Sequence, residues 1–261
     1  MDSTDVRAAS RRAGDHPALE STARVGYLVN GVLHIVIGVI AVQLAVRGKG
    51  SSADQSGALG ALADNTLGMV MLWIAVVAWL GLAIWQVTEV ISGGLRTSDR
   101  LKAAGKAVLY LALSWTAFDF ASGSGSSSKQ QSTDFTASLM KQPAGQWLVG
   151  AVGLLVVGIG VYHVVKGWKR TFLQDLETHP SEWIVKAGRV GYIAKGVALA
   201  IVGGLFVLAA VRHSPSEARG LDGALRNLLG APGGPVLLGL VALGLIAFGV
   251  YSFGRARHAD V

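Results

Sequence analysis

The feature that most constrains this chain is a unit of two apolar helices that occurs three times along it. Six apolar stretches lie at residues 25–46, 67–91, 101–121, 145–165, 188–211 and 235–253. Each is near the ~20 residues that a helix needs to cross ~30 Å of hydrocarbon. The charged residues, 15% of the chain, fall almost entirely between these stretches, whereas a soluble helical protein carries charges along every helix. The sequence therefore predicts an all-α integral membrane bundle of six transmembrane helices.

The repeat is visible at both ends of each unit. The first helix opens with Arg-Val-Gly-Tyr at residues 24–27 and 189–192, and with the related Lys-Ala-Val-Leu at 106–109. Near the end of each second helix, an aromatic residue is followed four residues later by a charged one. These pairs are Trp85 and Glu89, Tyr162 and Lys166, and Tyr251 and Arg255. Because each unit contributes two helices, all units have the same orientation, which predicts a parallel repeat in a pseudo-threefold arrangement.

The repeat also predicts the division of the chain. The segment before the first apolar stretch has charges of alternating sign and a proline at Pro17, so we expect it to be disordered. The expected divisions are a disordered cytoplasmic tail at 1–21, membrane repeats at 22–95, 96–170 and 171–257, and a cytoplasmic C-terminal end at 258–261.

A short segment lies between the two helices of each unit, at residues 56–63, 133–140 and 222–229. Each has a residue suited to an N-cap at its start, followed by apolar residues about one turn apart. The expected caps are Ser56, Thr133 and Asp222. The pattern predicts short amphipathic helices that lie flat at the outer membrane surface.

The basic residues predict the orientation. One side of the membrane, with residues 1–24, 96–106, 166–189 and 255–257, holds fifteen Lys and Arg, and the other side holds seven. This asymmetry places both termini in the cytoplasm of a bacterial inner membrane. The net charge of +7 is mostly an orientation signal, with affinity for anionic lipid headgroups at the cytoplasmic loops, and we expect no nucleic-acid partner.

Two longer motifs point to a family. The run QPAGQWLVG at 142–150 and the run GIGVYHVVKG at 158–167 resemble the central repeat of the membrane proteins called domain of unknown function 1206. The runs RVGY at 189–192 and DGAL at 222–225 resemble its third repeat. The resemblance covers nearly all of the chain from about residue 22 to 257. It implies a bacterial, actinobacterial inner-membrane protein, and it carries no activity or functional residues.

Polar groups inside the apolar stretches are the candidates for function, because a charge at the bilayer centre costs from ~3 kcal/mol upward. Lys195 is the foremost: its equivalents in the other repeats are Asn30 and Ala112, so the repeat does not require a lysine. Glu89 stands where the other repeats have cations, and we expect it to pair with Lys195. Two alternatives stay open: the lysine amine reaches the headgroups along its own stem, and the glutamate lies exposed at the interface.

Other polar residues accompany these two. Asn30 and His34 lie on one face of the first helix, and His163 has in the fourth helix the position that Gln86 has in the second. The candidate intramembrane polar cluster comprises Asn30, His34, Gln86, Glu89, His163 and Lys195. If their faces converge, they meet in the cytoplasmic half of the bundle. The alternative is that Asn, Gln and His act as interhelical hydrogen-bond partners worth ~0.6–2 kcal/mol each, with no ligand.

Small residues predict where helices pack. Gly196, Ala200 and Gly204 form a small-xxx-small stripe on the fifth apolar stretch. Such stripes let helix backbones approach closely where no hydrophobic force drives their association. We therefore assign the stripe to helix packing.

Several chemistries are excluded or not expected. The chain has no cysteine, which excludes disulfides and thiolate metal sites. His34 and His163 lie at different predicted depths, so we expect no haem between them, and no other cofactor or metal. Phosphate-binding loops, zinc-protease motifs and nucleophile elbows are absent from the sequence, and we expect no catalytic residues.

Two hypotheses about function remain. The first, favoured by a small margin, is a non-catalytic scaffold or accessory protein of the cytoplasmic membrane, whose basic loops engage lipid or an unidentified membrane protein. The second is a pathway for a small solute, ion or proton through the polar cluster. A cavity that reaches the cluster would favour the pathway, and a filled bundle would favour the scaffold.

Overall fold

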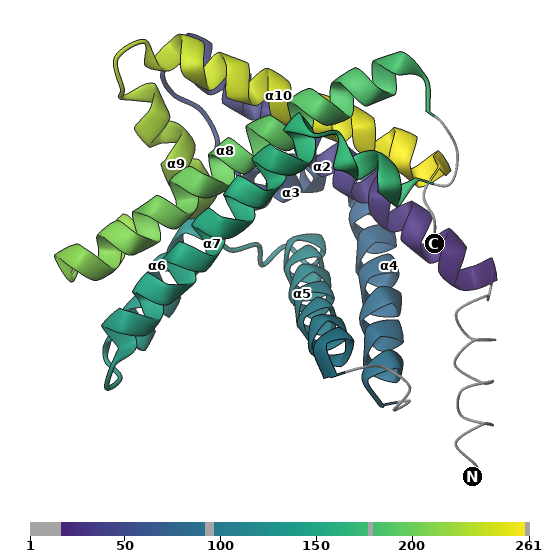
Figure 1. Cartoon of the computed structure of the whole chain (residues 1–261), viewed down its shortest axis with the longest axis horizontal. Coiled ribbons are helices and arrows are strands. Elements are labelled where there is room, and N and C mark those ends of the chain that lie inside the picture. Colours follow the sequence, from purple (N-terminus) through teal and green to yellow (C-terminus); the bar gives the residue numbers. More distant parts are fainter. Residues whose placement is uncertain (1–16, 92–96, 177–179, 259–261) are drawn as a thin grey trace.

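The computed structural model describes residues 17–91, 97–176 and 180–258, and its elements are helices (Figure 1). The long helices are α2 (Pro17–Arg47), α4 (Thr66–Ile91), α5 (Thr97–Ala121), α7 (Gly145–Trp168), α8 (Glu182–Arg212) and α10 (Gly234–His258). Between them lie the short helices α3 (Gln55–Ala63), α6 (Ser128–Met140) and α9 (Gly220–Leu229), and the 3₁₀ turns η1 (Thr171–Asp175) and η2 (Pro215–Glu217).

The long helices contain the six predicted apolar stretches. Five of them, all except α5, are long and apolar enough to cross a membrane. The first turns of α5 carry Asp99, Arg100, Lys102 and Lys106, so its apolar part is shorter. The all-helical membrane fold is confirmed, and the crossing of α5 stays a prediction. The structure differs from the disordered tail predicted at 1–21, because α2 already begins at Pro17. Residues 1–16 lie outside the described ranges.

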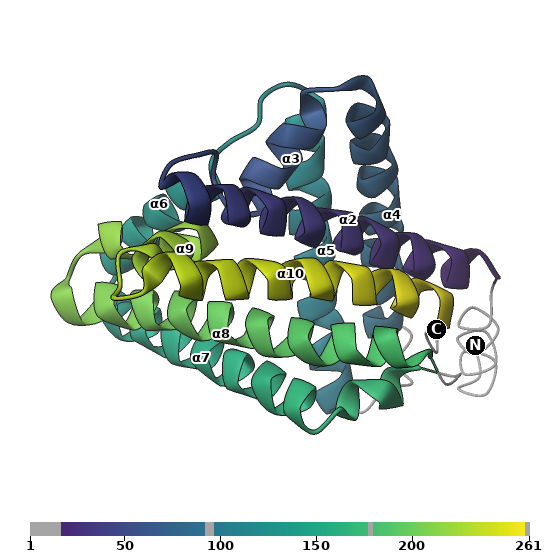
Figure 2. The same ribbon diagram turned by 90° about the horizontal axis from the view of Figure 1, so that it is seen from above.

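The long helices form three antiparallel pairs, and each pair joins two different repeats (Figures 1 and 2). The pairs are α4 with α5, α7 with α8, and α10 with α2. In each, the second helix of one repeat packs against the first helix of the next, and the third repeat returns to the first. This is the cyclic order of a threefold repeat.

The ring of helices is open on one side. Packing of α8 against α10 and of α2 against α4 joins the three pairs in a row. No comparable packing joins α5 to α7 among the described residues. Figures 1 and 2 show the α4–α5 pair crossing the layer of the other four helices, and Figure 1 shows α5 standing apart from α7.

In two of the pairs, glycines bring the two helices of the pair close together. In the α7–α8 pair, a Cβ atom at Gly160 would lie 2.7 Å from both the carbonyl oxygen of Gly196 and the backbone nitrogen of Ala200. The repeat-equivalent contact joins α10 to α2, where a Cβ at Gly249 would lie 2.6 Å from the carbonyl oxygen of Gly31. The backbones are therefore in direct contact, as is typical of membrane helices that associate through small residues.

The predicted stripe on α8 needs correction at its last position. Gly196 and Ala200 face α7, but Gly204 is exposed, with no atom within 4 Å of a Cβ placed there. Gly203 packs against Gly153 of α7 instead. At 3.6 residues per turn, a residue seven positions after Gly196 returns to the same face, whereas the next residue turns away from it.

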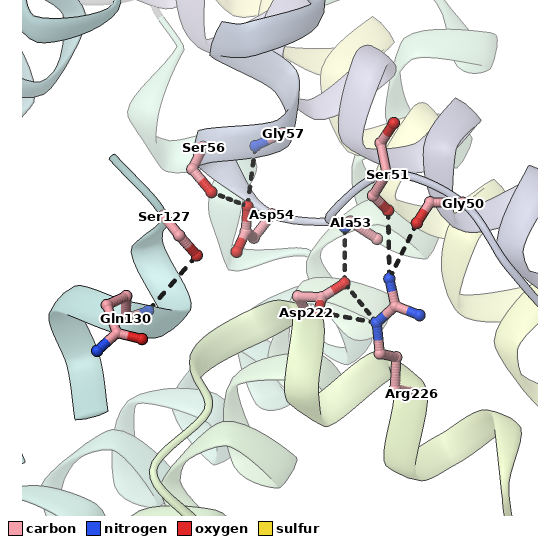
Figure 3. Close-up of polar contacts among 10 residues, drawn as sticks. All are labelled: Gly50, Ser51, Ala53, Asp54, Ser56, Gly57, Ser127, Gln130, Asp222 and Arg226. Carbon is pink, nitrogen blue, oxygen red and sulfur yellow. Dashed lines mark hydrogen bonds and ion pairs between the residues drawn. The ribbon is translucent and has the colours of Figure 1, made fainter. Parts of the chain in front are cut away.

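The three short helices are present, with caps other than those predicted. α3 starts after Asp54, whose carboxylate accepts the backbone N–H of Gly57 at 3.0 Å. α6 starts after Ser127, whose hydroxyl accepts the N–H of Gln130 at 3.5 Å (Figure 3). The predicted caps lie inside the helices: Ser56, Thr133 and Asp222.

The short helices also differ from the prediction in their burial. One position of the repeat is fully buried in all three units, occupied by Leu59, Thr136 and Leu225, each 0% exposed. A helix lying flat on lipid would present such residues to the bilayer. The short helices instead turn one face into the molecule, where Leu59 and Leu225 join the main hydrophobic core.

One glycine per repeat permits this inward turn. These glycines lie in the first turn of the helices that follow, at Gly68, Gly145 and Gly234. A Cβ at any of them would collide with a carbonyl oxygen near the end of the preceding short helix. The three collisions involve Leu62, Leu139 and Leu229.

A buried carboxylate links the first repeat to the third on the side of the molecule that carries the short helices (Figure 3). Asp222 of α9 accepts the backbone N–H of Ala53 at 2.9 Å and the Nε–H of Arg226 at 2.8 Å. Arg226 also donates to the carbonyl oxygen of Gly50 at 3.2 Å. The connection between α2 and α3 is therefore held on α9.

Candidate functional site

A cavity of about 310 Å³ lies among the long helices, and all six contribute side chains to its wall. Its lining extends from Arg255 near the end of α10 to Gln55 at the start of α3. These residues belong to opposite ends of the long helices, because α2 and α10 are antiparallel. Four of the six candidate polar residues line the cavity: Asn30, His34, His163 and Lys195.

Lys195 is the most unusual residue of the wall. Since α8 begins at Glu182, Lys195 lies about 20 Å along the helix from its first residue, and about 9 Å beyond Arg189. Its amine lies 4.1 Å from the ring centroid of Phe248. Among the described residues, no carboxylate oxygen lies within ion-pair distance of this amine. A cation–π contact offsets only part of the cost of a charge at this depth.

The aromatic side of the wall is built around Phe248. The ring of His34 lies 4.7 Å from it and the ring of Tyr192 lies 5.3 Å from it. The Nδ1–H of His34 donates to the carbonyl oxygen of Asn30, one turn earlier, at 2.8 Å. This bond fixes the orientation of the imidazole beside the amine of Lys195.

Two equivalent pairs of positions in the repeat carry different chemistry. Between α2 and α10, the amide of Asn30 donates to the hydroxyl of Ser252 at 3.2 Å. Lys195 has the repeat position of Asn30, and His163 has that of Ser252, so the α7–α8 pair places a cation and an imidazole where the other pair has a neutral hydrogen bond. Asn30 thus acts as an interhelical hydrogen-bond partner. For Lys195 the structure shows no such partner within the described residues.

The opposite wall is apolar. The α4–α5 pair contributes Trp79, Leu82, Leu109, Tyr110 and Leu113. Leu109 occupies the repeat position of Tyr192, and Leu82 that of Phe248. The cavity therefore has a cationic, hydrogen-bonding side and a mostly apolar, partly aromatic side.

The turn η1 packs against the wall at one end of the cavity. Phe172 is 0% exposed, and its ring stacks on Tyr192 at 5.3 Å. The carboxylate of Asp175 accepts from Lys166 at 2.7 Å and lies 3.8 Å from the guanidinium of Arg255. Tyr192 and Arg255 both line the cavity, so η1 supports this end of the wall through one ring and one shared carboxylate.

Gln86 and Glu89 do not line the cavity. The structure also records no ion pair between Glu89 and Lys195, although both are described, so their predicted pairing is wrong. The reason is the path of α4, which crosses the layer of the other helices. It brings Trp79 and Leu82 to the cavity and carries its last turns away.

Sequence reasoning missed several lining residues, among them Tyr27, Tyr110, Phe248, Tyr251, Ser252 and Arg255. Their repeat positions contained the signal. Ser252 and Arg255 align with His163 and Lys166, so the register that singled out His163 also marks Ser252. Within the described ranges, no group of three or more His, Asp or Glu is placed to hold a metal ion.

These features define a helical, membrane-type protein built from three repeats around an internal cavity. The family model for Domain of Unknown Function (DUF1206) matches residues 25–93, 101–170 and 190–259, once in each repeat, and the chain belongs to this family. The predicted resemblance is thereby confirmed.

A curated relative supports the same family. The chain is 31% identical to the Uncharacterized protein YxxB of Bacillus subtilis (strain 168) over 238 residues, which cover 87% of this chain and 86% of that protein. The predicted actinobacterial source stays a prediction. No solved structure matches the chain.

Proposed function

We propose that this protein binds a small organic anion in the cavity among its long helices and provides a route for it through the cytoplasmic membrane. A cavity that reaches the polar cluster favours a pathway over a scaffold. The cavity described above reaches four residues of that cluster. The observation that carries the proposal is Lys195, a cation within the apolar part of a membrane helix that lines the cavity. None of the residues described in the cavity wall is Asp or Glu.

The chemistry of the wall defines the ligand class. A buried charge without a partner is costly, and an anionic group on a ligand supplies the missing partner for Lys195. Arg255 is a second cation of the wall, and its Nε atom is buried without a hydrogen-bond partner. The apolar residues of α4 and α5 suit the carbon part of the molecule. A carboxylate or phosphate on a compact apolar body combines these properties.

The shape of the cavity supports a route. The lining runs between opposite ends of the long helices, and η1 packs against the wall at the Arg255 end. Passage then requires η1 to move. The excess of basic residues on this side supports an orientation with both termini and η1 in the cytoplasm.

The binding step can be tested with benzoate, acetate and inorganic phosphate as probes. Thermal unfolding in mild detergent is measured for the native protein, for Lys195→Met, and for Lys169→Met as a control whose lysine is exposed and outside the cavity wall. A bound anion at 100 times its Kd stabilises the folded state by about 2.7 kcal/mol. We expect at least one probe to stabilise the native protein and the control, and to leave Lys195→Met unchanged. Equal responses of all three proteins would refute the proposal.

The route is tested separately by uptake of the stabilising probe into proteoliposomes. We expect uptake by the native protein and its loss in Lys195→Met. Binding without uptake would show a binding protein and would remove the transport part of the proposal.

A further inference from the structure

A second pocket, of about 500 Å³, lies at the cytoplasmic end of α7 and α8, outside the cavity. Its wall consists of Arg170, Leu173, Pro180, Glu182, Val185, Lys186 and Arg189. Three of these are cations and one is a carboxylate. Glu182 and Lys186 pair with each other at 3.2 Å, with both side chains largely exposed, so the remaining positive charge belongs to Arg170 and Arg189.

The pocket lies at the level of the lipid headgroups. At ~1.5 Å per residue, Arg189 is about 35 Å along α8 from Arg212, slightly more than the ~30 Å of a hydrocarbon core. Trp168 and Trp183 are exposed beside it, and tryptophan is typical of this interface. The guanidinium of Arg189 lies 5.4 Å from the ring of Trp168, which holds it at the rim of the pocket.

The walls combine two kinds of surface. Arg170 and Arg189 provide planar donors that suit phosphate oxygens. Leu173, Pro180 and Val185 provide an apolar floor. A soluble phosphate uses only the first surface, whereas a phospholipid uses both: its phosphodiester faces the arginines and its glycerol and upper acyl carbons contact the floor.

We propose that this pocket is a specific site for an anionic phospholipid, with Arg170 and Arg189 as the residues that bind its phosphate. The site is independent of the function proposed for the cavity. The turn η1 contacts both places, since Leu173 lines the pocket while Phe172, its neighbour, is buried against the cavity-wall residue Tyr192.

The test is native mass spectrometry of the full chain with dioleoyl phosphatidylglycerol, dioleoyl phosphatidylcholine and inorganic phosphate as probes. We expect the native protein to retain one phosphatidylglycerol in preference to phosphatidylcholine by roughly tenfold or more. The double variant Arg170→Gln, Arg189→Gln should lose this preference. The matched control Lys169→Gln, which changes the exposed residue next to Arg170 but outside the pocket, should keep it.

Three results would overturn the proposal. They are an equal preference in the native protein and the double variant, a loss in Lys169→Gln as large as in the double variant, and complete displacement of the lipid by inorganic phosphate, which would assign the site to a soluble ligand. If the double variant does not fold, the single variant Arg170→Gln replaces it, because Arg170 is exposed and its loss should still weaken retention several-fold.

Discussion

The direct backbone contact between α7 and α8 leads to a quantitative prediction for Gly160→Ala. The added Cβ would lie 2.7 Å from two backbone atoms of α8, and neither can move without separating the helices. Overpacking of this kind costs about 1–3 kcal/mol. Gly158 is the control, because it lies on the same helix with no atom within 4 Å of a Cβ placed there. Gly158→Ala should be neutral or stabilising by up to about 1 kcal/mol, since alanine favours helix.

The measurement is unfolding of both variants in mixed micelles of dodecylmaltoside and sodium dodecyl sulfate, followed by far-UV circular dichroism. We expect the free energy of unfolding of Gly160→Ala to be about 1–4 kcal/mol below that of Gly158→Ala. Equal values for the two variants would show that the helices do not touch at Gly160, and the packing described for this pair would then be incorrect.

Three further predictions follow from other parts of the structure. Asp222→Ala should lower the free energy of unfolding by about 2–4 kcal/mol in the same assay, because it leaves the buried N–H of Ala53 without its acceptor and removes the carboxylate partner of Arg226; a loss below about 1 kcal/mol would contradict the role of the Asp222 contact. Asp175→Asn should loosen η1, so that the single cysteine of a Ser252→Cys variant, in a chain without native cysteine, reacts faster with a water-soluble maleimide; an unchanged rate would mean that Asp175 does not hold this end closed. Reporter fusions at Gly125 and after Val261 should report opposite sides of the membrane, and a shared side would refute the topology.

Local pattern accounts for the parts of the fold that the sequence predicts well. Apolar length, turn residues and the register of the repeat are properties of contiguous segments, so the long helices, the short helices and the repeats follow from them. The same register placed Asn30 and Lys195 at equivalent positions, and both line the cavity. Cap positions were predicted less well, because Asp54 and Ser127 compete with other nearby polar residues for that role.

Which residues form the site depends on how distant helices pack against each other, and no single segment of the sequence contains that information. Glu89 and Lys195 were expected to meet because each departs from its repeat position, yet the path of α4 separates them. Leu59 and Leu225 were expected to lie in the interface, yet they are in the core. In both cases the outcome depends on the angle at which whole helices cross, and that angle results from many contacts between distant residues.

The sequence by itself determined the helical membrane character of this protein, its three repeats and its family, because hydrophobic length and repeat register are encoded locally. Only the tertiary structure decided that each repeat pairs with the next and that the α4–α5 pair crosses the others. It also decided that Lys195 lines a cavity with no described carboxylate beside it. The physical reason is that helix pairing depends on which surfaces come into contact, as with the glycines of α7 and α8, and a sequence does not specify the partner of each surface.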